Sequence, residues 1–180
     1  MAKKIIKKGF TLVELLVVMA ILGVLVTILA SGFRNAQLRG HDTQRKSDLK
    51  EISNSLELFY QDYGYYPPAS NGYIDACPYN PGSNSGTACS WGSGVMTDSK
   101  TVYFKTMPDD PTSDYNYYYR TVAGSNDQKF QLYAHLENTQ DPDCINGDCT
   151  TPAVAVTCGG TSVCNFSIHS PNTTATETQP

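Results

Sequence analysis

Three zones of different hydrophobic pattern follow one another along the first third of this chain. Residues 10–30 are apolar on every side of a helix, residues 31–48 are mostly polar, and residues 49–63 carry an apolar stripe. In that stripe apolar side chains recur at alternating steps of three and four residues: Leu49, Ile52, Leu56, Phe59 and Tyr63. We therefore predict one long helix that packs a face of its last part against a globular head.

This helix is predicted to run from Thr11 to Tyr63 and to end at Gly64, since the prolines that follow cannot continue it. Gly32 and Gly40 lie in the polar zone, and each costs roughly 1 kcal/mol of helix propensity. We expect the helix to bend or melt there.

The rest of the chain has the pattern of loops and short strands. Residues 67–100 are rich in Gly, Pro, Ser and Asn and predict an irregular loop pinned by a disulfide. Residues 115–122 and 129–137 flank a Gly-containing connection and predict a β-hairpin. Either NFSIHS (165–170) or AVAVT (153–157) is expected to add a strand.

The second arm of the hairpin alternates apolar and polar residues, which predicts one packed face and one solvent face. The packed face would hold Phe130, Leu132, Ala134 and Leu136, and the solvent face Gln131, Tyr133, His135 and Glu137. Residues 171–180, PNTTATETQP, are almost free of apolar side chains and predict a flexible tail.

The apolar zone is long enough to cross a membrane. Phe10 to Ala30 spans roughly 30 Å as a helix, about the thickness of a bilayer core. Four lysines precede it (Lys3, Lys4, Lys7 and Lys8), so the positive-inside rule keeps the N-terminus in the cytoplasm and exports the rest. With a mean hydropathy of −0.33 the 180 residues hold one such element.

One carboxylate, Glu14, interrupts the apolar zone. A charged side chain near the centre of a membrane helix costs about 3 kcal/mol and usually has a partner. Cleavage between Gly9 and Phe10 would create an α-amine one helical turn from Glu14, largely cationic at neutral pH. Between two chains, that amine and Glu14 can form an ion pair that sets their register.

These residues carry a resemblance. The stretch KKGFTLVELLVVMAILGVL resembles the leader and N-terminal segment of type IV pilins and type II secretion pseudopilins, and the match covers residues 3 to about 30. The resemblance implies that a prepilin peptidase cuts after Gly9 and N-methylates Phe10, and that Glu14 is needed for filament assembly. It also implies an inner-membrane assembly platform and an ATPase as partners. The chain starting at Met1 is then the precursor.

The resemblance implies an α+β fold in which a long helix carries a small antiparallel β-sheet head, the lollipop form of type IV pilins. The expected division is a leader (1–9), a membrane and assembly helix (10–30), its amphipathic continuation (31–63), a β head with disulfide loops (64–170) and a flexible tail (171–180). The expected function is a structural subunit, major or minor, that polymerises with itself. It would sit in the inner membrane before joining an extracellular or periplasmic filament.

A second resemblance concerns the head. LELFYQDYGYYPP and MPDDPTSDYNYYY, followed by a strand pair, are similar to the layout of the G-type major pseudopilin and related short pilins over roughly residues 49–143. A secretion pseudopilus and a DNA-uptake pilus therefore stay open beside a surface pilus. A monomeric, membrane-anchored binding module is the alternative outside this family. The six cysteines and the segment after residue 143 depart from the minimal pseudopilin and favour a surface pilin.

Six cysteines lie on the exported side, where an oxidising compartment favours three disulfides. Of the 15 possible pairings, we predict the local one: Cys77 with Cys89, Cys144 with Cys149 and Cys158 with Cys164. Zinc is the rival, but the spacings C-x4-C and C-x5-C match its usual motifs poorly.

Calcium is the metal that the sequence favours, although no cofactor is required by the expected function. Asp141, Asp143, Asn146 and Asp148 offer hard oxygen ligands within eight residues. The G-type resemblance, with its calcium-binding late acidic loop, adds weight. Acidic turn residues chosen for turn chemistry are the alternative.

The net charge bears on whether the protein could bind nucleic acid. The four leader lysines belong to 13 basic side chains, so a processed chain would keep nine against 17 acidic ones, a net charge of −8. This balance disfavours nucleic-acid binding by the whole surface, with a local basic patch at Arg34, Arg39, Arg45 and Lys46 left open.

Neither the histidines nor the tyrosines identify a site by themselves. His41, His135 and His169 have no catalytic spacing, so we predict a protein that is not an enzyme. The twelve tyrosines are interpreted as packing residues with wet hydroxyls, a sugar-binding face being the alternative. Glycosylation at the sequons of Asn165 and Asn172 is left open.

Overall fold

The structure, a computed structural model, describes residues 9–152 and 154–177, with only the backbone for residues 29–32. The chain divides into two compact units, 1–38 and 39–180. Helix α1 (Leu12–Tyr63) contributes to both units and is helical through Gly32 and Gly40, where melting was expected. The predicted bounds of the helix are confirmed to within one residue.

In the second unit, α1 packs one face against the β-strands. Leu49, Ile52, Leu56 and Phe59 are fully buried in the main core, as the three-four spacing predicts, and Tyr63 packs at its edge. The helix ends because Gly64 takes a positive φ of 76°, and its N–H donates to the carbonyl of Tyr60 at 2.7 Å.

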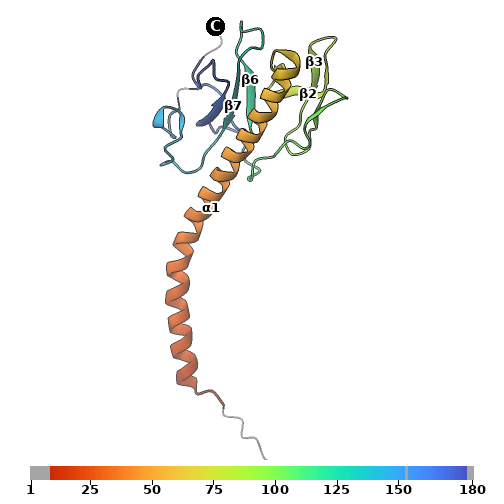
Figure 1. Cartoon of the computed structure of the whole chain (residues 1–180). Coiled ribbons are helices and arrows are strands. Elements are labelled where there is room, and N and C mark those ends of the chain that lie inside the picture. Colours follow the sequence, from red (N-terminus) through yellow and green to blue (C-terminus); the bar gives the residue numbers. More distant parts are fainter. Residues whose placement is uncertain (1–8, 153, 178–180) are drawn as a thin grey trace, which may run out of the picture. The chain divides into compact units, whose positions relative to one another are not determined.

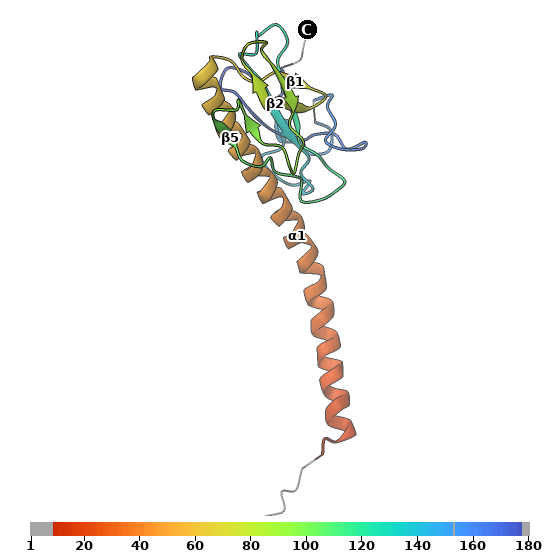
Figure 2. The same ribbon diagram turned by 90° about the vertical axis from the view of Figure 1, so that its right-hand side faces the viewer.

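Within the described residues, eight short strands form three antiparallel sheets around this part of the helix (Figures 1 and 2). The first contains β1 (Ala69–Ser70), β2 (Tyr73–Asn80) and β3 (Ser85–Ala88), the second β4 (Met96–Thr97) and β5 (Val102–Phe104), and the third β6 (Tyr118–Thr121), β7 (Phe130–Ala134) and β8 (Phe166–His169). A short 3-10 helix, η1, spans Ile145–Gly147. In Figure 1, β2 and β3 lie on one side of the end of α1 and β6 and β7 on the other. The α+β class is confirmed.

The prediction of an irregular loop over residues 67–100 was wrong, because this segment holds four of the strands. Ile74, Ala76 and Tyr79 of β2 are buried in the main core, while Asn-Gly at 71–72 and Pro-Gly-Ser-Asn at 81–84 form turns between the strands. Gly86 allows β3 to pair closely with β2, since an added Cβ would lie 2.2 Å from the carbonyl oxygen of Asp75. The many turn-forming residues in this segment led us to miss the short strands that lie between the turns.

The predicted hairpin is confirmed as β6 and β7, with Tyr119 opposite Leu132. NFSIHS supplies the third strand, β8, which pairs with the other edge of β7. Of residues 154–157, only Thr157 makes an isolated bridge, with Val163. The AVAVT alternative is therefore not a strand in the described residues.

The expected solvent face of β7 is covered. Gln131 and Tyr133 are both fully buried. Tyr133 packs in a second, smaller core whose other buried residues are Ile145, Val154, Val156, Cys158 and Cys164. Alternation along β7 was predicted correctly, but the segments that follow β7 bury its second face as well.

Residues 171–177 form part of that cover, contrary to the flexible tail predicted for 171–180. Gln131 donates to the carbonyl of Thr174, and the Tyr133 hydroxyl donates to the carbonyl of Ala175 at 2.7 Å. Lys129 pairs with the Glu177 carboxylate at 2.7 Å. This segment binds β7 through its own backbone carbonyls, so its lack of apolar side chains did not indicate whether it is ordered. Residues 178–180 lie outside the described residues.

Three disulfides join neighbouring cysteines: Cys77–Cys89, Cys144–Cys149 and Cys158–Cys164. These are the local pairs expected from the sequence, and no cysteine is free. Each joins residues separated by 12 positions or fewer. The bridges therefore stabilise the long connections of the head locally.

Two tyrosines of the hairpin make a matched test of the covering segment. We expect Tyr133→Phe to destabilise the head by about 1–3 kcal/mol, because it removes the hydroxyl that bonds Ala175 and Arg120. Tyr118→Phe should change stability by less than about 0.5 kcal/mol, because the Tyr118 hydroxyl has no partner in the described chain. Thermal unfolding of the full chain in detergent, followed by near-ultraviolet circular dichroism, measures both. If both variants lose the same stability, residues 171–177 do not stabilise the head through Tyr133.

Candidate functional site

The predicted scissile bond lies in an exposed, non-helical segment. Gly9 and Phe10 precede the helix, and Phe10 is 83% exposed. A Cβ added at Gly9 would meet no atom within 4 Å, and the backbone there is not left-handed. The fold of this chain therefore does not itself require glycine at position 9. The leader lysines lie outside the described residues.

Glu14 caps the helix that contains it. Thr11 precedes the first helical residue, and its N–H and hydroxyl both donate to Glu14 Oε2, at 2.8 and 2.7 Å. In return the Glu14 N–H donates to the Thr11 hydroxyl at 3.2 Å. This reciprocal pair is a capping box, which the spacing T-x-x-E indicates in the sequence but which was not predicted. Glu14 Oε1 has no partner in the described chain.

The helical segment after Glu14 exposes apolar side chains on every side. Four consecutive residues, Leu15, Leu16, Val17 and Val18, are 47–63% exposed although they point in different directions around the helix. Its most apolar 18-residue window has a mean hydropathy of 2.9 and is 0% buried. A helix of this length and composition can cross a bilayer, and apolar surface on all sides is typical of a helix covered by lipid or by other helices.

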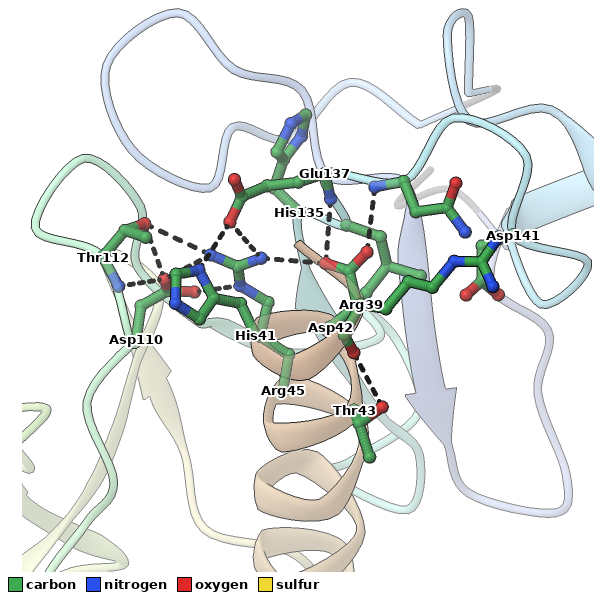
Figure 3. Close-up of polar contacts among 12 residues, drawn as sticks. Arg39, His41, Asp42, Thr43, Arg45, Asp110, Thr112, His135, Glu137 and Asp141 are labelled. Carbon is green, nitrogen blue, oxygen red and sulfur yellow. Dashed lines mark hydrogen bonds and ion pairs between the residues drawn. The ribbon is translucent and has the colours of Figure 1, made fainter. Parts of the chain in front are cut away.

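In the second unit, a buried arginine joins α1 to two distant loops (Figure 3). Arg45 is fully buried, and its Nε and Nη2 donate to the two oxygens of Asp110 at 2.8 and 2.7 Å. Its Nη1 lies 2.9 Å from Asp42 and 2.8 Å from Glu137. Burial alone would lower the pKa of Arg45, but the hydrogen bonds and charges of Asp110 and Glu137 outweigh it and raise that pKa.

Asp42 extends this network to the backbone. Its two oxygens accept the N–H groups of Glu137 and Asn138, each at 2.9 Å (Figure 3). One turn of helix thereby holds the segment before the Cys144–Cys149 loop and the loop at Asp110 in fixed positions. The single cation, Arg45, is buried and lies among three carboxylates of this chain, so its contacts are internal and the network is structural.

Two of the four residues of the local basic patch that the sequence left open, Arg45 and Lys46, are paired with carboxylates. Arg45 is enclosed by carboxylates, and the Lys46 ammonium pairs with Asp141 and Asp143 at 2.7 Å each. Both cations are therefore neutralised within the head. Helical spacing placed basic residues near each other but did not reveal the acidic loops that cover them.

The four residues considered for calcium are not assembled around one point. Asp141 and Asp143 bind Lys46, while Asp148 accepts hydrogen bonds from Thr150 and Thr151. Partial burial would raise the pKa of Asp141, but Lys46 and the Asp143 N–H lower it below its usual value. Within residues 9–152 and 154–177, no group of three His, Cys, Asp or Glu side chains is placed to hold a metal. In this structure the Lys46 ammonium bridges the two aspartates.

Asn165 and the histidines have structural contacts. Asn165 of the first sequon is 1% exposed and bonds the backbone of Leu136 and Cys149, so its amide is inaccessible to glycosylation. Asn172 of the second is exposed. The three histidines lie apart: His41 contacts Glu137, His135 the carbonyl of Val163, and His169 the carbonyl of Ser170.

Comparison with known proteins bears on the N-terminal segment first. Residues 6–30 match the family model described as the prokaryotic N-terminal methylation motif. The chain is 28% identical over 128 residues to the type II secretion system core protein G of Pseudomonas aeruginosa, covering 71% of this chain and 82% of that protein. No solved structure matches.

Two further relatives match shorter stretches. The type IV major pilin protein PilA of Myxococcus xanthus is 33% identical over 64 residues, which cover 36% of this chain and 29% of that protein. The type II secretion system core protein G of Escherichia coli is 29% identical over 66 residues, 37% of this chain and 46% of that protein.

Two adjacent cations test the structural role of the buried network. Arg45→Met should destabilise the head by about 3–5 kcal/mol, because it leaves Asp110 and Asp42 buried without their cation. Lys46→Met removes the same charge from a partly exposed pair and should cost about 1 kcal/mol or less. Urea unfolding of the full chain in detergent, followed by the fluorescence of Trp91, compares them. The assignment fails if both losses are small.

Proposed function

Because the chain belongs to the family of type IV pilins and type II secretion pseudopilins, we propose that it is the structural subunit of a type IV pilus-like filament. One observation carries the proposal: a helix apolar on all sides follows directly after an exposed Gly9–Phe10 bond and contains one carboxylate, Glu14. In a monomer this surface needs lipid. In a filament, copies of the same helix cover it.

Processing prepares the subunit for assembly. A prepilin peptidase at the cytoplasmic face of the inner membrane cuts after Gly9 and methylates the new amine of Phe10. The exposed, non-helical position of this bond supports the step, because a protease needs an accessible, extended substrate. The processed chain waits in the membrane with its head exported, and an assembly platform and its ATPase add it to the filament.

Glu14 then has two roles that use different oxygens. Oε2 keeps its bonds to Thr11, both of whose donors remain after cleavage. Oε1 is free to accept the Phe10 amine of a neighbouring subunit. Apolar surroundings strengthen this pair because screening by water is absent. The Glu14 charge makes membrane insertion of a single helix less favourable. Between two neighbouring helices, the same charge favours the one axial register in which the ion pair forms.

A secretion pseudopilus is the second candidate. The alignment with core protein G covers 71% of this chain, about twice the share covered by the pilin alignment. The three disulfides of the head support an exported, exposed filament in either case. A monomeric anchored module is the third candidate, and the assembly test below separates it from the first two.

Processing is tested at the cleavage site. Purified from its native envelope, the chain should begin at N-methylated Phe10, as read by intact mass and N-terminal sequencing. Gly9→Val should leave it uncleaved without changing the fold, because a side chain at position 9 meets no atom of the chain itself. A native protein that keeps Met1 would contradict the proposal.

Assembly is tested with three variants of the apolar helix. Glu14→Ala should insert into the membrane and be cleaved, but should reduce the yield of sheared filaments at least tenfold. Thr11→Val breaks the capping box while keeping Glu14, and should keep most of that yield. Thr27→Ala is the control, since this hydroxyl bonds only the carbonyl of Val24.

Thr11→Val also distinguishes two roles of Glu14, that of a helix cap and that of a partner in an intersubunit ion pair. If Thr11→Val loses filaments as completely as Glu14→Ala, the carboxylate acts as a helix cap and the intersubunit pair is refuted. If no variant, nor the native chain, forms filaments in an envelope that carries the assembly machinery, the anchored module replaces the filament subunit.

A further inference from the structure

A small aromatic hollow lies on the head, and none of its lining residues belongs to the Arg45 network. It has a volume of about 190 Å³ and is lined by Asn71, Tyr73, Trp91, Asn116, Tyr117, Tyr118, Thr157 and Gly159. Trp91 stacks on Tyr73 with ring centroids 6.2 Å apart and meets the edge of Tyr117 at 5.7 Å. Pockets for drug-sized ligands begin at roughly 300 Å³, so this one suits a single ring.

Four separate segments build the hollow, and the fold fixes each of them. The N–H of Tyr119 donates to the carbonyl of Gly72, and the N–H of Asn116 donates to the carbonyl of Cys158. Cys158 and Cys89, which lies two residues before Trp91, are both in disulfides. A hollow held this way is formed before any ligand arrives, which lowers the entropy cost of binding.

Most polar side chains that line the hollow have no hydrogen-bond partner in the described chain, the Tyr117 hydroxyl being the exception, and Asn71 and Asn116 are exposed. Of the twelve tyrosines, nine have a hydrogen-bonded hydroxyl: Tyr60, Tyr63, Tyr65, Tyr66, Tyr79, Tyr103, Tyr117, Tyr119 and Tyr133. The other three are Tyr73, Tyr115 and Tyr118, and two of these line the hollow. The side chains of Asn71, Asn116 and Trp91 also have no hydrogen-bond partner within residues 9–152 and 154–177.

The chemistry of the lining selects a class of ligand. None of its eight residues is charged, so it lacks the arginine or lysine that phosphate and carboxylate ligands require. Aromatic rings offer apolar surface, and the two amides offer both donors and acceptors. A sugar ring matches this combination, because it has an apolar C–H face and hydroxyls at its edge. A quaternary ammonium would use the rings but not the amides.

We propose that this hollow is a binding site for a neutral monosaccharide unit, stacked on the Trp91 side and hydrogen-bonded by Asn71 and Asn116. The site lies wholly within the head and does not depend on the filament assignment. The tyrosines, which we interpreted as packing residues, therefore fall into two groups. Most are buried or hydrogen-bonded, whereas Tyr73 and Tyr118 would face the ligand.

Trp91 is the chain's one tryptophan, so its fluorescence reports this site alone. The full chain in a polyoxyethylene detergent, which has no sugar headgroup, is titrated with methyl glycosides of glucose, galactose, mannose and N-acetylglucosamine. At least one should change the emission saturably. Choline is titrated in parallel to test the quaternary ammonium alternative.

Asn116→Ala is the test variant, because it keeps Trp91 and its backbone is not left-handed, unlike that of Asn71. It should weaken the best glycoside at least about fivefold, the effect of one lost hydrogen bond. Asn54→Ala removes an exposed amide from the helix and should leave binding unchanged. Near-ultraviolet circular dichroism checks that both variants are folded.

Three results would overturn the proposal. They are a response to choline alone, no saturable response to any glycoside up to about 100 mM, far above a millimolar Kd, or equal weakening by Asn116→Ala and Asn54→Ala. A saturable glycoside response that Asn116→Ala weakens and Asn54→Ala does not would establish the site.

Discussion

The first part of α1 has an apolar surface that the chain itself does not cover, and this surface determines which surroundings the protein can occupy. Leu12 to Ile28 presents hydrophobic side chains in all directions, so water is an unsuitable surrounding for it throughout. Lipid can cover the helix first and other copies afterwards. Transfer between two apolar surroundings gains little hydrophobic free energy, so specific contacts must determine how the copies align. Glu14 is the one charged group available for this in the segment.

The elements that the sequence predicts well are those with a strong local signal. The three-four spacing from Leu49 to Phe59 predicted which side chains are buried, and Gly64 predicted the end of the helix. The hairpin of β6 and β7 followed from two strand-like runs that flank a Gly-containing turn. The neighbouring cysteines pair locally, as expected. In each case, the interaction involves residues close in the chain.

Several contacts that the sequence did not reveal join residues far apart in the chain. A basic patch that includes Arg45 was left open because its carboxylate partner, Asp110, lies 65 positions away. The contact of Lys46 with Asp141, 95 positions away, was likewise not visible in the sequence. Residues 171–177 were expected to be flexible because they have almost no apolar side chains. They instead bind through backbone carbonyls, which no side-chain pattern reveals. The capping box at Thr11 is different, since its signal is local and its spacing is visible in the sequence.

Filament assembly, as proposed, requires Glu14 to bind the amine of a neighbouring subunit while it caps its own helix. A cryo-electron microscopy reconstruction of filaments sheared from the native cell, at a resolution that shows side chains, tests this most directly. We predict that the Glu14 carboxylate lies within about 4 Å of the methylated Phe10 nitrogen of an adjacent subunit, the range of an ion pair. A Glu14 that contacts only Thr11 of its own chain, with every Phe10 amine elsewhere, would contradict the proposal.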